Sequence, residues 1–332
     1  MALLSASIVV FVLACLGLAA PAAAAGHSFA VIYNNYKNDH GFNESAVHGI
    51  DRFEHDTGVP VREQVIQSEE ESVRAMRRFA GAGIDNIVLI GFVNEHPVSV
   101  VAPEFPDTQF TLIDGVVDRP NVRSVLFRED EAGYLVGVAA GLKTRTGKVG
   151  FVGAIPIPPI LRYECGFVQG VARGNAQASV LRRYLPSSPH PFNDRDGAVA
   201  VAHALAAEGA DILFPAAGLS GLGALDVVAE DGLLGIGVDV DQDGLYTGHM
   251  LTSAVKRVDI GVYDAFKAAF EGRWTSGIRL LGLAEDGVGW AHGPADAFVE
   301  DIAPAVDAVG RQIANGAIRV TDYRGEPACK HD

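Results

Sequence analysis

Cysteine and basic residues are both scarce in this chain. Its 332 residues contain 3 cysteines, and 26 Lys and Arg residues face 41 Asp and Glu residues, which gives a formal net charge of −15. A nucleic-acid-binding surface needs an excess of basic side chains, so this balance argues against a nucleic-acid partner. No Cys-x-x-Cys motif and no His/Cys cluster is present, so the sequence indicates neither a metal site nor any other cofactor.

Catalytic motifs are also lacking. Ser220 follows Gly218 at the right distance for a nucleophile elbow, but Leu222 stands where the motif Gly-x-Ser-x-Gly requires glycine. His203 lies in an alanine-rich helical stretch, and the carboxylates are scattered over predicted helix faces. The sequence therefore predicts a binding protein rather than an enzyme.

The first 25 residues differ in composition from the rest of the chain. The stretch from Leu3 to Ala20 is almost continuously apolar, and small residues follow it up to Ala25. This pattern predicts a secretory signal peptide cleaved near Ala25, and hence a periplasmic protein, although the segment lacks the usual basic residues at its start. Two alternatives remain, a membrane anchor and a lipoprotein box in which Cys15 carries the lipid.

Only Cys165 and Cys329 remain once a signal peptide is removed. An oxidising compartment would allow them to form a disulfide, but the sequence does not place them close together. A buried free thiol at Cys165 is the alternative.

The rest of the chain alternates β-rich runs with amphipathic helical stretches. Ser68 begins a capping box, Ser-Glu-Glu-Glu, at the start of one predicted helix. Such a βαβα rhythm predicts a parallel, doubly wound sheet. The rhythm restarts at Lys148 without a Pro- or Gly-rich linker. Two similar α/β lobes with a cleft between them are therefore expected.

Charged residues end several of the predicted buried strands. Leu233 to Val238 stops at Asp239, and Met250 to Val255 stops at Lys256; Asp114 ends another apolar run. In open α/β sheets the carboxyl ends of the strands bind ligands. The acidic loop after Asp239 imitates an EF-hand, but its twelfth position is Met250 where calcium needs a bidentate glutamate.

Several segments together carry a family resemblance, and they are GFNESA at 41–46, FTLIDG at 110–115, FREDEAGYLVGVAAGLKTRTGK at 127–148, IPPILRYECGFVQG at 157–170, PFND at 191–194, AAG at 216–218 and GIGVDVDQDGLYTGHMLTSAVKRVD at 235–259. In order and spacing they resemble the basic membrane protein (PnrA-like) family, periplasmic substrate-binding proteins that capture purine nucleosides for ABC importers. The resemblance covers nearly the whole mature chain.

The resemblance implies the fold of a type I periplasmic binding protein. Its two doubly wound, parallel-sheet lobes would be joined by hinge strands where the chain crosses three times. The implied division places residues 26–127 and 253–283 in the N-terminal lobe, and residues 128–252 and 284–332 in the C-terminal lobe.

The resemblance also implies a ligand site. Phe42 and Phe192 match the two rings that sandwich the base, although ordinary core packing is the alternative for each. Asp239 and Lys256 match the ribose ligands, and a structural ion pair at the hinge is the alternative. Three more residues match positions that make polar contacts with the ligand in the family: Asn43, Asp114 and Gly218.

One position departs from the family pattern. Where the family carries an aspartate that binds the purine edge, this chain reads Tyr33-Asn34-Asn35-Tyr36. An amide both donates and accepts hydrogen bonds, whereas a carboxylate only accepts. We hypothesise that Asn34, or alternatively Asn35, replaces the aspartate and favours an oxopurine. His48 likewise replaces a large aromatic residue of the family.

The expected function is therefore that of a monomeric periplasmic substrate-binding component, which passes a purine nucleoside or purine base to a cognate ABC permease in the inner membrane. The alternatives are a ligand-sensing surface lipoprotein of the same fold, and a binder of another small heterocycle or of a sugar. An exported nucleoside hydrolase would need a group of acids or a metal set at the cleft.

Overall fold

The computed structural model describes residues 27–292, 298–324 and 329. The expected signal peptide and the alternative lipid site at Cys15 lie outside these residues. In the part of the chain that the structure describes, every helix is too short or too polar to cross a membrane.

The first lobe contains an entirely parallel sheet with the strand order β11-β5-β4-β3-β1-β2. Its strands are β1 (Phe29–Asn34), β2 (Val61–Ile66), β3 (Asn86–Ile90), β4 (Gln109–Ile113), β5 (Val122–Phe127) and β11 (Gly277–Leu281). The helices of this lobe are α1 (Phe42–Thr57), α2 (Glu69–Gly81), α3 (Glu95–Val101) and α8 (Val258–Phe270), with short 3-10 turns η1 (Phe92–Asn94) and η2 (Ala102–Glu104).

The second lobe repeats this plan with the strand order β12-β10-β9-β8-β6-β7. Its strands are β6 (Lys148–Gly153), β7 (Ser179–Tyr184), β8 (Ile212–Ala216), β9 (Leu234–Asp239), β10 (Met250–Lys256) and β12 (Val288–Trp290), of which only β12 runs antiparallel to its neighbour. The helices of this lobe are α4 (Glu129–Lys143), α5 (Pro158–Gly174), α6 (Arg195–Ala207), α7 (Leu219–Glu230) and α9 (Ala303–Ala314), with the turn η3 (Leu283–Glu285).

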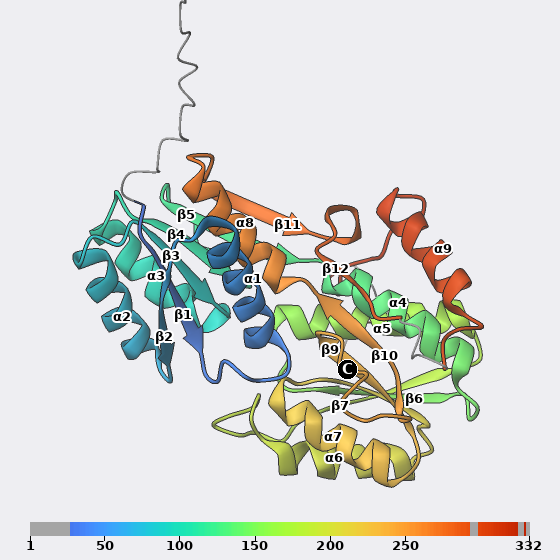
Figure 1. Ribbon diagram of the computed structural model, residues 1–332. Coiled ribbons are helices and arrows are strands. Elements are labelled where there is room, and N and C mark those ends of the chain that lie inside the picture. Colours follow the sequence, from blue (N-terminus) through green and yellow to red (C-terminus); the bar gives the residue numbers. More distant parts are fainter. Residues whose placement is uncertain (1–26, 293–297, 325–328, 330–332) are drawn as a thin grey trace, which may run out of the picture.

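Local sequence signals explain many of these boundaries. The Ser68 side chain accepts a hydrogen bond from the Glu71 backbone N–H, as the capping-box motif predicts. Gly58 ends α1 in the left-handed conformation that glycine adopts without strain. The strands β1 and β3 are buried on both faces, which matches their continuous apolar sequences. The predicted fold class is confirmed: two parallel-sheet α/β lobes lie side by side (Figure 1).

The chain passes between the lobes three times. It enters the second lobe after β5, returns to the first lobe between β10 and α8, and leaves again after β11. Strand β10 pairs with β9 and β12 as far as Lys256, so the return lies after Lys256 and not at residue 253, where the sequence-based division set it. The apolar run of β10 continues to the end of the strand, which keeps it in the second sheet.

One hydrophobic core joins the two lobes. It includes Phe29 and Phe266 of the first lobe, residues along α4, and Phe151 and Phe214 of the second lobe. A disulfide links Cys165 of α5 to Cys329. Of the two alternatives that the sequence left open, a disulfide and a free thiol at Cys165, the disulfide is therefore correct.

Candidate ligand-binding site

A cavity of about 460 Å³ lies between the carboxyl edges of the two sheets. The structure brings all the site residues expected from the sequence to its wall. They are Asn34, Phe42, Asn43 and Asp114 from the first lobe, Phe192, Gly218 and Asp239 from the second, and Lys256 at the return between them. Ligand-binding cavities of this size enclose most of a small organic molecule.

Left-handed backbone conformations mark the strand ends around this cavity. Asp114 has a φ of 65° directly after β4, and Asp239 has a φ of 68° at the end of β9. Gly91 after β3 and Gly218 after β8 also have positive φ, at 94° and 56°. For a residue other than glycine this conformation is strained, and such strain gathers at functional sites. The two aspartates therefore occupy equivalent strained positions in the two lobes.

Lys256 is the centre of a buried charged network. Its side chain is only 2% exposed, and its Nζ forms ion pairs with Asp114 and, at 2.8 Å, with Glu129. Although burial disfavours the ammonium ion, the carboxylates of Asp114 and Glu129 raise the pKa of Lys256. Burial would raise the pKa of Glu129, but Lys256 and Arg162 together lower it. The lysine is therefore held as a cation at the cavity wall.

Asp239 faces the same cavity with a perturbed carboxyl group. Loss of solvent raises the pKa of Asp239 to about 7, against the attraction of Lys256 and with repulsion from Asp39 and Asp114 contributing. The Tyr163 hydroxyl donates a hydrogen bond to Asp239 Oδ1 at 3.2 Å. Asp239 therefore lies near the balance between its neutral and ionised forms at neutral pH, and a ligand that donates hydrogen bonds would favour the ionised form.

The opposite wall offers amide groups. Asn43 Nδ2 donates to the Asn34 backbone carbonyl at 2.9 Å and to Asp39 Oδ2 at 3.0 Å. Burial raises the pKa of Asp39, whose carboxylate also accepts hydrogen bonds from the first backbone N–H groups of α1. The side-chain oxygens of Asn34, Asn43 and Asp114 (one Oδ1 each) are buried and accept no hydrogen bond from the residues described here. Buried acceptors of this kind need a donor, which a ligand can supply.

Three phenylalanines contribute aromatic surface to the cavity, beside aliphatic residues such as Ile160 and Val238. Phe192 lies in the loop before α6 and Phe42 begins α1, so each lobe contributes one of the expected rings. The ring centroid of Phe192 is 6.4 Å from that of Phe92, which also lines the cavity. The Phe42 ring lies beside the charged network, because Lys256 Nζ is 5.0 Å from its centroid. The cavity therefore has an aromatic region around Phe92 and Phe192 and an ionic region around Lys256, and the Phe42 ring lies at the edge of the ionic region.

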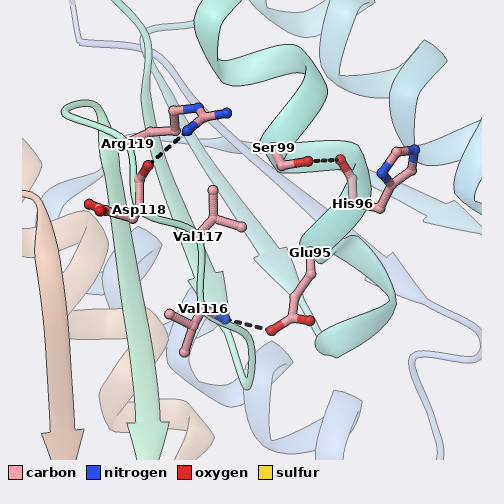
Figure 2. Close-up of a pocket in the computed structure, with 7 residues that line it drawn as sticks. All are labelled: Glu95, His96, Ser99, Val116, Val117, Asp118 and Arg119. Atoms are coloured by element: carbon pink, nitrogen blue, oxygen red, sulfur yellow. Dashed lines mark hydrogen bonds between the residues drawn. The ribbon is translucent and has the colours of Figure 1, made fainter.

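A second, smaller depression of about 310 Å³ lies on the first lobe, between the start of α3 and the loop at residues 116–119 (Figure 2). Glu95 at the start of α3 accepts a hydrogen bond from the Val116 backbone N–H at 2.7 Å. A side chain at Gly115 would collide with Glu95 and Leu112. The Glu95 carboxylate thus holds the loop that follows Asp114, and Asp114 lines the main cavity. We interpret the depression as part of the structure that positions Asp114 and not as a separate ligand site.

Sequence reasoning did not identify several residues around this cavity. Phe92, Asp39 and Tyr163 line it, and Glu129 and Arg162 complete the charge network behind it. Glu129 looks like an ordinary acidic residue in a first helical turn, where such residues are common on exposed surfaces. Its burial, together with its ion pairs to Lys256 and Arg162, shows that Glu129 belongs to the charged network. Within residues 27–292, 298–324 and 329, no three His, Cys, Asp or Glu side chains are arranged to hold a metal ion.

Comparisons with known proteins point to a transport family. Residues 27–323 match the family model described as ABC transporter substrate-binding protein PnrA-like. The basic membrane protein D of Borreliella burgdorferi is 30% identical over 296 residues, which cover 85% of this chain and 84% of that protein. The CD4+ T-cell-stimulating antigen of Listeria monocytogenes is 31% identical, with 86% of this chain and 85% of the relative covered.

Two further similar proteins come from other organisms. An uncharacterized lipoprotein of Pyrococcus horikoshii is 33% identical over 76% of this chain, and the match spans 66% of that lipoprotein's length. Among solved structures, an ABC transporter solute-binding protein from Aeropyrum pernix superposes with a TM-score of 0.80 at 28% identity, covering 90% of this chain and 94% of that one.

Proposed function

Because the chain belongs to the PnrA-like family of ABC transporter substrate-binding proteins, we propose that it binds a purine nucleoside, or the related free purine, between its lobes. In this proposal the loaded protein delivers the purine to an ABC permease in the inner membrane. The protein works outside the cytoplasm, either free in the periplasm or as a lipoprotein.

The observation that carries this proposal is the division of one cavity into an aromatic and an ionic region. Phe42 and Phe192 would hold a flat ring, because stacking of a base on an aromatic side chain contributes about 1–3 kcal/mol. The ionised carboxylate of Asp239 would accept two hydrogen bonds from a vicinal diol. Lys256 would donate to a ribose oxygen and favour the ionised form of that carboxylate.

Asn34 would read the edge of the base. The N1–H group and the 6-oxo group of hypoxanthine or guanine form a donor beside an acceptor, and a carboxamide presents the complementary pair. The buried, unpartnered Oδ1 of Asn34 would accept from the ring N–H, and its Nδ2 would donate to the 6-oxo oxygen. We therefore propose inosine and guanosine as preferred ligands.

Two other ligand roles fit the same fold. The names of the archaeal relatives include the word lipoprotein, which favours a surface-anchored ligand sensor as the second candidate. A neighbouring permease and ATPase gene pair would favour transport over sensing. A sugar ligand would use the ionic region alone and leave the phenylalanine rings without a stacking partner.

The deciding experiment is mass spectrometry of small molecules released from purified, denatured protein, followed by calorimetry with inosine, guanosine, adenosine, hypoxanthine and ribose. We expect a co-purified purine, and tighter binding of nucleosides than of ribose. A ligand at 100 times its Kd should also add about 2.7 kcal/mol to the stability. The proposal fails if no purine binds. Release of free base from inosine during incubation would instead indicate a hydrolase.

A further inference from the structure

The acidic loop between β9 and β10 is built around a buried glutamine. Gln242 is 4% exposed, although its neighbour Asp241 is exposed. The acidic side chains around Gln242 point to different partners. Asp239 accepts from Tyr163, Asp241 accepts from the Asp243 backbone N–H, and Asp243 accepts from the Ser253 hydroxyl. The loop that imitates a calcium motif is thus a scaffold for Gln242.

Three hydrogen bonds fix the position of Gln242. Its backbone N–H donates to Ser253 Oγ at 3.0 Å, and its Oε1 accepts from the Val238 backbone N–H at 3.0 Å. The bond from Val238 assigns the amide orientation, so that Nε2 points away from the second lobe. Nε2 then donates to the backbone carbonyl of His40 at 2.7 Å. Gly237 leaves the necessary room, because a Cβ there would lie 2.8 Å from the Cβ of Gln242.

His40 belongs to the first lobe, in the loop between β1 and α1. Its φ of 50° is left-handed, and its backbone N–H donates to Glu44 Oε2 at 3.1 Å. The adjacent Asp39 holds Gly41 and Asn43 through their backbone N–H groups. The loop is therefore fixed within its own lobe, with the His40 carbonyl turned to the other lobe.

The contact between Gln242 and His40 joins elements 202 residues apart in the sequence and lies beside the ligand cavity. A Cβ at Gly41 would be 3.6 Å from Asp239 Oδ2, so the same loop closes over the ionic region. Gln242 itself is not among the described residues that line the cavity. Its Oε1 bonds Val238, which lines the cavity, whereas its Nε2 bonds only the other lobe, so a change confined to Nε2 acts on a ligand through the position of the lobes.

We propose that Gln242 is a positioning residue that latches the two lobes closed over the bound ligand. The latch is the hydrogen bond from Gln242 Nε2 to the His40 carbonyl. It rests on the proposed binding of a ligand between the lobes. The latch forms only when the lobes are together, so it stabilises the closed state and slows ligand release without contacting the ligand.

The test compares the wild type with Gln242→Glu at pH 8, using inosine as the probe in stopped-flow binding. Glutamate keeps the acceptor for Val238 and replaces the latch donor with an acceptor. We expect inosine to dissociate about tenfold faster, which corresponds to about 1.4 kcal/mol, with little change in the association rate. Gln242→Met removes the latch donor and the acceptor for Val238 without adding a charge, and it should act in the same direction. Asp241→Asn, a change in an exposed neighbour that keeps its acceptor, is the matched control and should behave as the wild type.

Small-angle X-ray scattering of the ligand-free proteins provides a second readout that does not depend on the ligand. Gln242→Glu should have a larger radius of gyration than the wild type, since the closed state is weakened. Unchanged dissociation and an unchanged radius would overturn the latch. If inosine does not bind the wild type, the proposed ligand fails, and the scattering comparison still decides whether the latch exists. A lower melting temperature alone, with neither other effect, would mean that Gln242 only supports its loop and would also overturn the latch.

Discussion

Asp239 combines a strained backbone with a carboxyl group that is costly to ionise. It has a positive φ, and burial raises its pKa to about 7. The pKa of an aspartate in an unfolded chain is about 3.9. Between these two values the folded protein binds a proton that the unfolded chain does not. The stability of the ligand-free protein should therefore decrease as the pH rises from about 4 to about 7.

We expect Asp239→Asn to separate stability from binding. The amide keeps an acceptor for Tyr163 but needs no ionisation, so the ligand-free variant should melt at a higher temperature than the wild type at pH 8. The difference should shrink at pH 5. Inosine affinity should fall by at least about tenfold, because each hydrogen bond to a charged group contributes about 1.5–3 kcal/mol.

The measurements are thermal unfolding at both pH values and calorimetry with inosine. Equal melting temperatures at pH 8 would contradict the raised pKa of Asp239, and unchanged affinity would show that Asp239 does not bind the ribose.

Asn34 allows a test of base preference. Aspartate at this position still accepts from a ring N–H but repels a 6-oxo group. Asn34→Asp should therefore lower the affinity for inosine relative to adenosine by roughly 10-fold to 100-fold, the effect of one unsatisfied buried polar group. Asn38→Asp is the control, because Asn38 is exposed and is not among the described residues that line the cavity. Competition calorimetry gives the ratio, and the same ratio in wild type and Asn34→Asp would exclude this role.

Single-residue predictions from the sequence were good where a charged residue ended an apolar run. Asp114, Asp239 and Lys256 could be placed at the cavity edge for that reason, and they line it. Phe92 could not be found in this way, because a phenylalanine after a buried strand has the same pattern as a core residue. Its position opposite Phe192 depends on how the lobes meet.

At the scale of elements, α4 and α5 pack through a stripe of glycines. Each helix carries three of them at four-residue spacing, and these are Gly133, Gly137, Gly141, Gly166, Gly170 and Gly174. A Cβ at Gly137 would lie 2.5 Å from the Phe167 carbonyl, and one at Gly170 would lie 2.1 Å from the Tyr134 carbonyl. The backbones are therefore in direct contact. This contact fixes Glu129, at the start of α4, beside Arg162 of α5.

Gly137→Ala should destabilise the protein by about 1–3 kcal/mol, the usual cost of overpacking a tight interface. Gly81→Ala is the matched control in α2. A Cβ there meets nothing within 4 Å, and alanine stabilises a helix by about 0.5–1 kcal/mol relative to glycine. Urea unfolding measures both. A neutral Gly137→Ala would mean that the two helices can move apart without loss.

The boundaries of most elements follow from the sequence, but this close packing does not. The strand Met250–Lys256 agrees with the expected apolar run, because a charged residue ends it. Glycines in the interior of a helix usually lower its stability. The α4 sequence alone also does not indicate which helix these glycines pack against. The partner is known only from the fold.

At the scale of the whole molecule, the disulfide ties the C-terminal region to α5. It joins residues separated by 164 positions. Closing a long loop in the unfolded chain typically adds about 2–4 kcal/mol of stability. Reduction should therefore lower the urea midpoint of the wild type. The double variant Cys165→Ser/Cys329→Ser should have the lower midpoint with or without reductant. A midpoint that does not respond to reductant would show that the bond does not stabilise the fold.

The two windings could be read from the sequence, whereas the contacts between the lobes could not. Periodicity reports which residues face a sheet, but it contains no information on pairs such as His40 and Gln242. The division implied by the family resemblance set the return of the chain a few residues too early, since an apolar strand fits either sheet equally well.

The late return of the chain sets the order in which the protein can be completed. The edge strand β11 and the helix α8 belong to the first lobe, yet they follow β10 of the second. Asp259 of α8 donates its backbone N–H to Ser45 of α1, and Gly49 leaves room for this close approach. During synthesis, more than four fifths of the chain must therefore be available before the first lobe can be finished. Export in an unfolded form, as the proposed function implies, would meet this requirement after translocation, when both lobes can fold together.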